Sequence, residues 1–308
     1  MINPLRPAIL AAAKSPRMRS AVVKAPVTSR IVRRFVAGES RPVMRTAARE
    51  LLDSGRMISV DFLGENTAER AQADATVAEY LALITELGEL ARGTATEVSM
   101  KLSALGQALG PDGPKIATDN LRVLCAQAQK GDVWITVDAE DHTTTEATLA
   151  TVRELRTEFS WLGMVLQAGL HRTADDCREF SGPDARVRLC KGAYRESASV
   201  AYQRKSEIDA AYLRCLEILL AGAGYPMVAT HDPELIAAAQ RLAAPDQPYE
   251  HQMLYGIREP EQLRLAQAGH KVRVYLPYGD QWYPYFMRRL AERPANLTFF
   301  LRALVSRS

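Results

Sequence analysis

The sequence predicts an α/β protein whose fold is a (β/α)8 barrel of the TIM type, preceded by a helical arm. Eight apolar runs of strand length recur after residue 55, and the segments between them have helical periodicity. Eight such alternations in about 250 residues are typical of this barrel. A doubly wound sheet is the structural alternative, but no G-x-G-x-x-G motif follows an early strand.

The expected strands are nearly continuous in hydrophobicity, as strands buried on both faces should be. They are the runs 57–63, 97–105, 133–140, 161–169, 185–194, 225–230, 249–254 and 271–279. The spacers contain good helix formers, for example in 67–88 and in 206–224, and the second of these closes on glycines.

The composition is that of a globular protein in a reducing compartment. Of the 308 residues, 47% are hydrophobic and 24% are charged, and no run approaches the roughly 18 apolar residues of a membrane span. The first residues are too broken in hydrophobicity for a secretory signal. The four cysteines lie in unrelated segments without a C-x-x-C pair. We therefore expect a cytoplasmic protein.

The charge is distributed unevenly along the chain. Residues 1–50 contain eleven Lys or Arg and two acids, a balance of +9, which leaves −6 for the rest. We therefore divide the chain into a basic helical arm, 1–50, and a barrel domain, 51–308. A basic arm suits nucleic acid, anionic lipid or an acidic partner, or is simply a solvated helix on the barrel.

Polar side chains end nearly every expected strand, where a barrel of this kind places its active site. Singly, each could be a helix cap or a satisfied core residue, but together they predict a polar mouth. They are Asp61, Glu65, Lys101, Asp138, Gln167, Arg188, Lys191, Thr230, His231, Gln252 and Tyr275.

A helix expected from Trp282 onward places Tyr285, Arg288, Arg289 and Glu292 on one face. Adjacent arginines suit a carboxylate, because the planar guanidinium can form two parallel hydrogen bonds to it. The alternative is a solvated face with an Arg288–Glu292 pair, but the aromatic Tyr285 is unusual there. The mouth is therefore expected to bind an anion.

The residues alone leave several chemistries open. The five histidines lack metal-site spacing, so no metal is expected, and no G-x-S-x-G motif supplies an acyl-transfer nucleophile. Lys101 or Lys191 could form a Schiff base, as in a barrel lyase or aldolase. An anion-binding module without chemistry is a third hypothesis, although it has no need of Asp138 or Gln167.

Seven segments resemble, in order and spacing, the motifs of proline dehydrogenase of the single-function bacterial type. They are EVSMKLSAL, ITVDAE, VLQAG, VRLCKGAY, ATHD, HQMLYG and YLPYGDQWYPYFMRRLAE, and the resemblance runs from about residue 55 to 300. It implies a distorted (β/α)8 barrel that binds FAD non-covalently. It also implies oxidation of L-proline to Δ1-pyrroline-5-carboxylate, with hydride passing from proline C5 to flavin N5 and electrons then going to a membrane quinone.

The resemblance also assigns roles to residues. Lys101, Arg288 and Arg289 would hold the proline carboxylate, with Glu65 or Glu292 paired to the arginines. The ring would pack against Tyr275, Tyr285 and Leu254, and Tyr275 favours proline over hydroxyproline. Asp138 and Arg188 match catalytic positions, Arg188 near flavin N5 and Asp138 positioning Lys101 and the flavin edge. The positions that match flavin contacts are Ala139, Gln167, Arg188, Lys191, Gly192, Ala193, Thr230 and His231.

Two positions depart from the family pattern, Asp232 and Arg293, which stand where asparagine is frequent. The resemblance gives no part to nucleic acid, and it leaves open a partner pyrroline-5-carboxylate dehydrogenase. The basic arm, outside the motifs, could dock the protein on the anionic inner face of the cell membrane, where the quinone lies.

Overall fold

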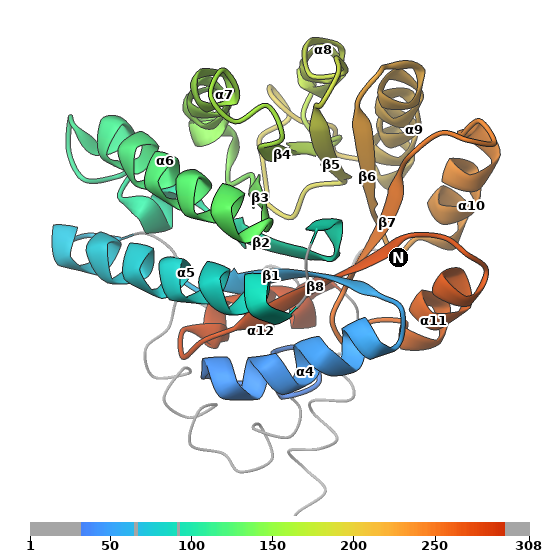
Figure 1. The fold of residues 1–308 in the computed structure, drawn as a ribbon. Helices are drawn as coiled ribbons and strands as arrows, with labels where there is room; N and C mark the ends of the chain where they lie inside the picture. The colour runs from blue at the N-terminus through green and yellow to red at the C-terminus, as the bar shows by residue number, and fades with distance from the viewer. Residues whose placement is uncertain (1–31, 65–66, 91–92, 293–308) are drawn as a thin grey trace, which may run out of the picture.

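The computed structural model describes residues 32–64, 67–90 and 93–292, with the side chains of 290–292 excepted. Eight parallel strands form a closed barrel in chain order, from β1 to β8, and β8 pairs with β1 (Figure 1). The strands are β1 (Met57–Phe62), β2 (Thr96–Met100), β3 (Trp134–Val137), β4 (Gly163–Gln167), β5 (Arg186–Cys190), β6 (Tyr225–Ala229), β7 (Glu250–Leu254) and β8 (Val272–Tyr278). The barrel and all eight expected strands are confirmed.

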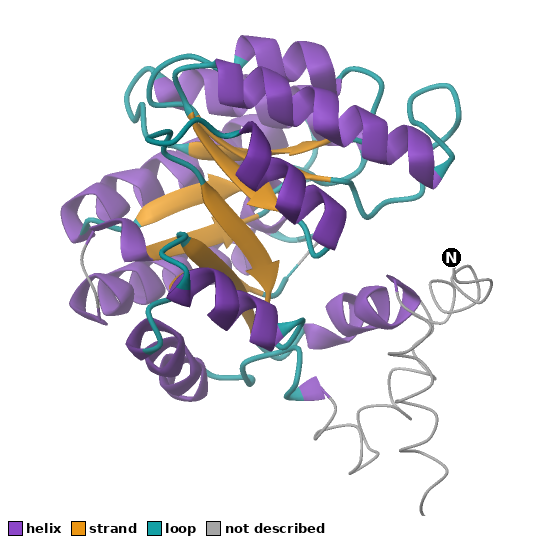
Figure 2. Cartoon of the chain, turned by 90° about the vertical axis from the view of Figure 1, so that its right-hand side faces the viewer, coloured by secondary structure: helices purple, strands orange, loops and turns teal. Residues whose placement is uncertain are grey.

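Helices surround the strands, as two views at right angles show (Figures 1 and 2). They are α4 (Arg41–Asp53), α5 (Arg70–Leu90), α6 (Gly113–Gly131), α7 (His142–Arg156), α8 (Thr173–Glu179), α9 (Lys205–Ala221), α10 (Pro233–Leu242), α11 (Glu259–Gln267) and α12 (Trp282–Glu292), with 3-10 turns at Gly93–Ala95 and Leu102–Leu105. No helix in the described ranges combines the length and the apolar character needed to cross a membrane.

Local sequence explains several helix starts at the carboxyl ends of strands. The Asp141 side chain accepts a hydrogen bond from the Thr143 amide (2.9 Å) at the start of α7. Asp232 accepts one from the Glu234 amide (3.2 Å) at the start of α10, and proline at the first helical position suits that start. The strand-to-helix turns that carry the mouth are therefore fixed by short polar side chains.

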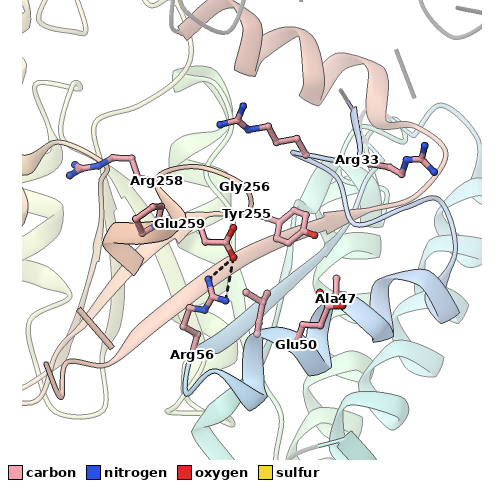
Figure 3. A pocket seen from close by; sticks show the side chains of 11 residues that line it. Arg33, Ala47, Glu50, Arg56, Tyr255, Gly256, Arg258 and Glu259 are labelled. Atoms are coloured by element: carbon pink, nitrogen blue, oxygen red, sulfur yellow. Dashed lines mark hydrogen bonds and ion pairs between the residues drawn. The ribbon is translucent and has the colours of Figure 1, made fainter. Parts of the chain in front are cut away.

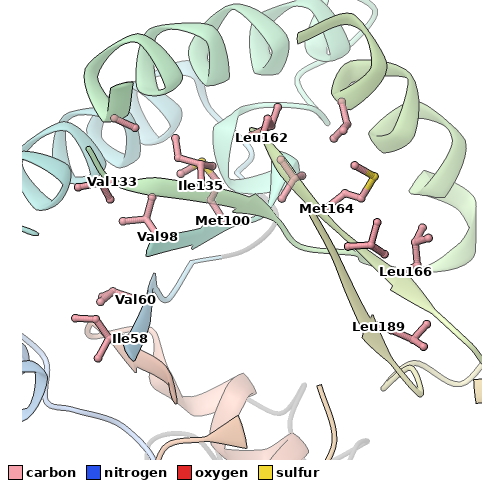
Figure 4. Close-up of a cluster of buried hydrophobic side chains, with 14 of the residues drawn as sticks. Ile58, Val60, Val98, Met100, Val133, Ile135, Leu162, Met164, Leu166 and Leu189 are labelled. Atoms are coloured by element: carbon pink, nitrogen blue, oxygen red, sulfur yellow. The ribbon is translucent and has the colours of Figure 1, made fainter. Parts of the chain in front are cut away.

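The apolar core lies between the strands and the helices. Alternate strand residues such as Val98, Ile135 and Met164 are fully buried in this layer (Figure 4). Because successive side chains point to opposite faces of a strand, the other set points into the barrel. That inner set contains many buried polar residues, among them Glu97, Arg186, Glu250 and Arg273.

The inner set forms ion pairs across the barrel. Glu97 on β2 pairs with Arg186 and with Arg188, both on β5, and Glu250 on β7 pairs with Arg273 on β8 (2.6 Å). Burial alone would raise the pKa of Glu97, but Arg273, Arg188 and Arg186 outweigh it and hold that pKa well below its ordinary value. Each of these five inner charges therefore has a partner of opposite sign.

The segment before α4 is attached to the end of β8 and to α12. The Ala37 amide donates to the Pro277 carbonyl (2.8 Å), and the Trp282 indole donates to Glu39 (2.8 Å). Farther along, a Cβ at Gly256, whose φ is +69°, would lie 1.6 Å from the Arg34 carbonyl oxygen. Only glycine permits this close approach. The division of the chain at residue 50 stays a prediction.

Candidate active site

Asp138, just after β3, and Arg188, on β5, form an ion pair at the carboxyl-terminal half of the barrel. Arg188 Nη1 lies 2.8 Å from Asp138 Oδ1 and 2.7 Å from the Ser99 hydroxyl. Its Nη2 lies 2.5 Å from Glu97 and 3.0 Å from Ser59. Four partners from three other strands or their ends thus hold one guanidinium in a single orientation.

The remaining donor of Arg188, Nε, is buried and has no hydrogen-bond partner among the described residues, and the same is true of Nε in Arg186 and Arg289. Burial lowers the pKa of Arg188, but Glu97 and Asp138 outweigh this and raise it above its ordinary value. The group is therefore a permanent cation with one unused donor, and a buried unused donor is costly without a ligand.

Tyr275 on β8 connects Asp138 to a second carboxylate. Its hydroxyl lies 2.8 Å from Asp138 Oδ2 and 2.6 Å from Asp61 Oδ2. Lys101, at the end of β2, places Nζ 3.3 Å from the same Asp61 oxygen. Asp138 and Lys101 are thus linked through Tyr275 and Asp61.

Burial controls the protonation of Asp61 and Tyr275. It raises the pKa of Asp61 above the ordinary value, a rise that Lys101 offsets in part and Asp138 reinforces. Burial, Asp138 and Asp61 raise the pKa of Tyr275 well above its usual range. Tyr275 therefore keeps its hydroxyl hydrogen at neutral pH, and Asp61 is a stronger base than an exposed aspartate.

Helix α12 carries the arginine pair. The Arg289 guanidinium carbon lies 5.0 Å from the centre of the Tyr285 ring, and both side chains are buried. Arg288 is only partly buried. Glu65 and the Glu292 side chain, proposed as partners of the arginines, lie outside the described residues.

The positions that match flavin contacts follow β3, β4, β5 and β6. Gly192 has φ +100°, and a Cβ there would lie 3.2 Å from Gln167 Oε1. Gln167 donates to the Glu140 carbonyl (2.8 Å), and Ala139 is partly buried beside it in sequence. Gly192 is exposed, and its backbone lies so close to the Gln167 side chain that a Cβ would crowd it. Lys191 and Ala193 flank this glycine.

Lys191 is held by carboxylates from two other elements. Its Nζ lies 2.6 Å from Asp209 of α9 and 2.8 Å from Asp232 at the end of β6. The departure at Asp232 thus supplies both an ion pair and the cap of α10. Thr230 accepts from the Asp232 amide (3.1 Å).

His231 joins the end of β6 to β7. Its Nε2 accepts a hydrogen bond from the Leu254 amide (2.9 Å), and its carbonyl accepts one from Arg258 (2.6 Å). Nε2 is therefore without a proton, and Nδ1 is the ring nitrogen left to donate. Leu254 itself is partly buried.

The sequence did not lead us to several residues that hold Arg188, and one residue that we expected at the mouth lies deeper in the barrel. Glu97, Ser99 and Ser59 hold Arg188, and the missed signal was their period-two alternation with apolar residues. Gln252, expected at the mouth, is buried and donates to Glu250 (2.6 Å).

A separate pocket of about 450 Å³ lies between α4 and the loop after β7 (Figure 3). None of the expected site residues lines it. It contains an Arg56–Glu259 ion pair (3.4 Å), and Arg33 and Arg258, which also line it, point in different directions. The barrel mouth therefore remains the candidate active site.

Comparison with known proteins matches residues 44–302 to the family model described as proline dehydrogenase. The chain is 38% identical over 279 residues to proline dehydrogenase 1 of Bacillus subtilis, which covers 89% of this chain and 91% of the relative. It is 37% identical over 281 residues to the proline dehydrogenase of Deinococcus radiodurans, covering 89% and 90%.

A solved structure of proline utilization A (PutA) from Bdellovibrio bacteriovorus, inactivated by N-propargylglycine, superposes with a TM-score of 0.80 at 25% identity. The match covers 97% of this chain but 37% of that one, so the chain spans about a third of the solved PutA. The family model and the single-function relatives both extend over most of this sequence. The chain therefore belongs to the proline dehydrogenase family of oxidoreductases.

Proposed function

We propose that the chain oxidises L-proline to Δ1-pyrroline-5-carboxylate with non-covalently bound FAD, the first step of proline catabolism to glutamate. The observation that carries the proposal is the buried Arg188, with one donor unused and its other nitrogens fixed by Asp138, Ser99, Glu97 and Ser59. A fixed cation of this kind stabilises negative charge that develops on a cofactor or substrate.

The chain's residues fit a flavin. The unused Arg188 Nε is a donor that lacks an acceptor, and Gly192 is an exposed residue with positive φ whose backbone packs closely on Gln167, another of the assigned flavin contacts. We assign flavin contacts to Ala139, Gln167, Arg188, Lys191, Gly192, Ala193, Thr230 and His231. When bound, FAD supplies the oxidant that accepts hydride from proline C5 at its N5.

The proline contacts come from the other side of the barrel. Lys101, Arg288 and Arg289 would hold the carboxylate, because lysine and paired arginines match its charge and geometry. Tyr275, Tyr285 and Leu254 would enclose the ring, and Glu292 would pair with the arginines. Asp138 accepts hydrogen bonds from Arg188, assigned to the flavin, and from Tyr275, assigned to proline, and so fixes these two side chains relative to each other.

The electron acceptor and location follow from the same proposal. We infer that a membrane quinone takes the electrons from the reduced cofactor, and that the protein is cytoplasmic, with a peripheral contact to anionic lipid. A pyrroline-5-carboxylate dehydrogenase is the reaction class that would consume the product.

An absorption spectrum before and after anaerobic L-proline tests this function. We expect the FAD-loaded protein to be yellow and to bleach on addition of proline. A flavin that does not bleach would leave the cofactor but remove proline as the substrate. Failure to take up FAD would favour a lysine-based lyase, although Lys101 and Lys191 both carry carboxylate partners, which suits a cation more than a nucleophilic amine.

A further inference from the structure

The Tyr275 hydroxyl lies between two carboxyl groups and has one hydrogen to give. It is 2.6 Å from Asp61 Oδ2 and 2.8 Å from Asp138 Oδ2, both hydrogen-bond distances. If both carboxyls were ionised, one of these contacts would join two acceptors. The chain Asp61–Tyr275–Asp138 therefore has room for one more proton.

The surroundings decide which carboxyl takes that proton. Asp138 faces the Arg188 guanidinium and accepts from the Ser99 hydroxyl (2.8 Å), so its charge is well compensated. Asp61 is 1% exposed and faces one cation in the described part of the chain, Lys101 just after β2, at 3.3 Å.

The third group that faces Asp61 is Tyr80 of α5. Its hydroxyl lies 3.3 Å from Asp61 Oδ1 but only 2.8 Å from the Ser99 carbonyl, so its hydrogen goes mainly to the carbonyl. Asp61 is thus the less compensated of the two carboxyls, and burial disfavours its charge.

We propose that Asp61 accepts the proton that the ammonium group of L-proline must lose, and that the Tyr275 hydroxyl passes it on. The assignment rests on the proposed proline oxidation. Tyr275 is the partly exposed member of the chain, whereas Asp61 is enclosed, so a substrate reaches Asp61 through Tyr275.

The transfer balances as follows. The substrate N–H bond breaks, Tyr275 takes that proton and gives its own to Asp61, which becomes a neutral carboxylic acid. The lone pair left on nitrogen would then form the C=N bond as the C5–H electron pair leaves as hydride, for which bound FAD would be the oxidant. Proline loses one proton and one hydride, so the product forms as the protonated imine, and the two electrons go with the hydride.

Substrate binding itself would promote this step. When the proline carboxylate engages Lys101, it competes with Asp61 for the same ammonium group. The negative charge of Asp61 is then balanced less well by Lys101, and the affinity of Asp61 for a proton rises. The Asp61–Lys101 pair thus couples recognition of the carboxylate to deprotonation of the amine.

A pH profile of kcat tests the proton transfer. We expect Asp61→Asn to lower kcat near neutral pH by ~10²-fold, the usual loss of a general base. The rate should recover as pH approaches the pKa of the substrate amine, and Asp61→Glu should restore part of the neutral-pH rate. Asp74→Asn, an exposed carboxylate of α5 that pairs only with Arg70 in the described part of the chain, is the control and should keep the parent profile. A loss in Asp61→Asn by the same factor at every pH would overturn the proposal.

Proton uptake on binding gives a second readout, without turnover. Tetrahydrofuran-2-carboxylate keeps the carboxylate but has oxygen in place of the ammonium, so it cannot donate a proton. Calorimetry of the FAD-loaded protein in buffers of different ionisation enthalpy should show proton uptake that Asp61→Asn abolishes. Equal uptake in both proteins, or none in the parent, would contradict the assignment.

Tyr275→Phe guards against an Asp61 variant that does not fold. It leaves Asp61 in place, so uptake with the analogue should persist while kcat falls near neutral pH. An unchanged kcat would remove Tyr275 as the relay. If the parent flavin does not bleach with proline, the proposed function itself fails, whereas bleaching with a parallel pH profile removes only the role of Asp61.

Discussion

Arg288 and Arg289 are neighbours in sequence with different surroundings. Arg289 is buried beside the Tyr285 ring, whereas Arg288 is partly exposed. We expect Arg288→Met to raise KM for proline by roughly 10- to 100-fold, the worth of a charged hydrogen bond, with flavin content unchanged. Steady-state kinetics and the flavin spectrum check this. Arg264→Met, an exposed arginine of α11, is the control, and loss of flavin in Arg288→Met would place the residue in the cofactor site.

His251 on β7 makes stability depend on pH. It is 1% exposed, and neither ring nitrogen has a hydrogen-bond partner in the ranges described. Burial and His270 lower its pKa from 6.5 to about 4. Between these pH values the unfolded chain binds a proton that the folded protein does not, so stability falls as pH drops through this window, by at most about 3 kcal/mol.

We therefore expect His251→Phe to flatten the loss of unfolding free energy between pH 6.5 and 4. Denaturant titrations at several pH values measure it. His171→Phe, at an exposed position, should follow the parent curve. Parallel curves for His251→Phe and the parent would show that this histidine is not the cause.

One carboxylate joins the start of α7 to the loop after β5. Glu196 accepts from the His142 amide (2.9 Å), and its other oxygen lies 2.5 Å from His142 Nδ1. The loop from 191 to 204 carries Lys191, Gly192 and Ala193, so Glu196 ties the proposed flavin contacts to a rigid helix.

We expect Glu196→Ala to weaken FAD binding by about fivefold, because loss of a hydrogen bond to a helix N-terminal amide costs ~1 kcal/mol and frees the loop. Flavin fluorescence on dilution gives the dissociation constant. Glu234→Ala, on the first turn of α10, leaves that loop untouched and serves as the comparison. Equal affinity of all three proteins would mean that the loop is ordered without Glu196.

Sequence patterns located the strands better than they located their ends. The run 97–105 was expected to be one strand, but β2 stops at Met100 and Leu102–Leu105 form a 3-10 turn. The run 185–194 ends earlier, at Cys190, because Gly192 turns the chain. A lysine follows each strand end, but apolar residues resume within both runs, so hydrophobicity alone does not mark where pairing with the neighbouring strand stops.

The same limit applied to the mouth. Asp138, Arg188, Lys101 and Tyr275 were found from their positions at strand ends, which sequence supplies. Their partners depend on which strands face each other across the barrel. The spacing of these residues along the sequence does not show which strands those are. Asp61 was noted as a strand-end residue, but its contact with Tyr275 requires β1 and β8 to pair.

Across the whole molecule, the N-terminal segment has a positive net charge and the rest of the chain a small negative net charge. Residues 1–31 contain six Lys or Arg and no acid. Since α4 packs on the barrel with Met44 and Ala48 buried, deleting 1–31 spares that helix, whereas deleting 1–50 would cut through it. We expect the 1–31 deletion to reduce sedimentation with anionic liposomes at low salt. Neutral liposomes are the control, and undiminished binding to anionic ones would refute membrane docking by this segment.

The pairing of Glu97 with two arginines of β5 has a consequence for how the barrel assembles. β2 and β5 are not neighbours, so the ion pair exists only after β3 and β4 have closed the distance between them. A fragment that ended after the fourth strand would bury a carboxylate with no counter-ion, and its complement would bury the unpaired arginines. Neither half should be stable by itself, so this barrel is unsuited to recombination from separate halves and should unfold as one cooperative unit.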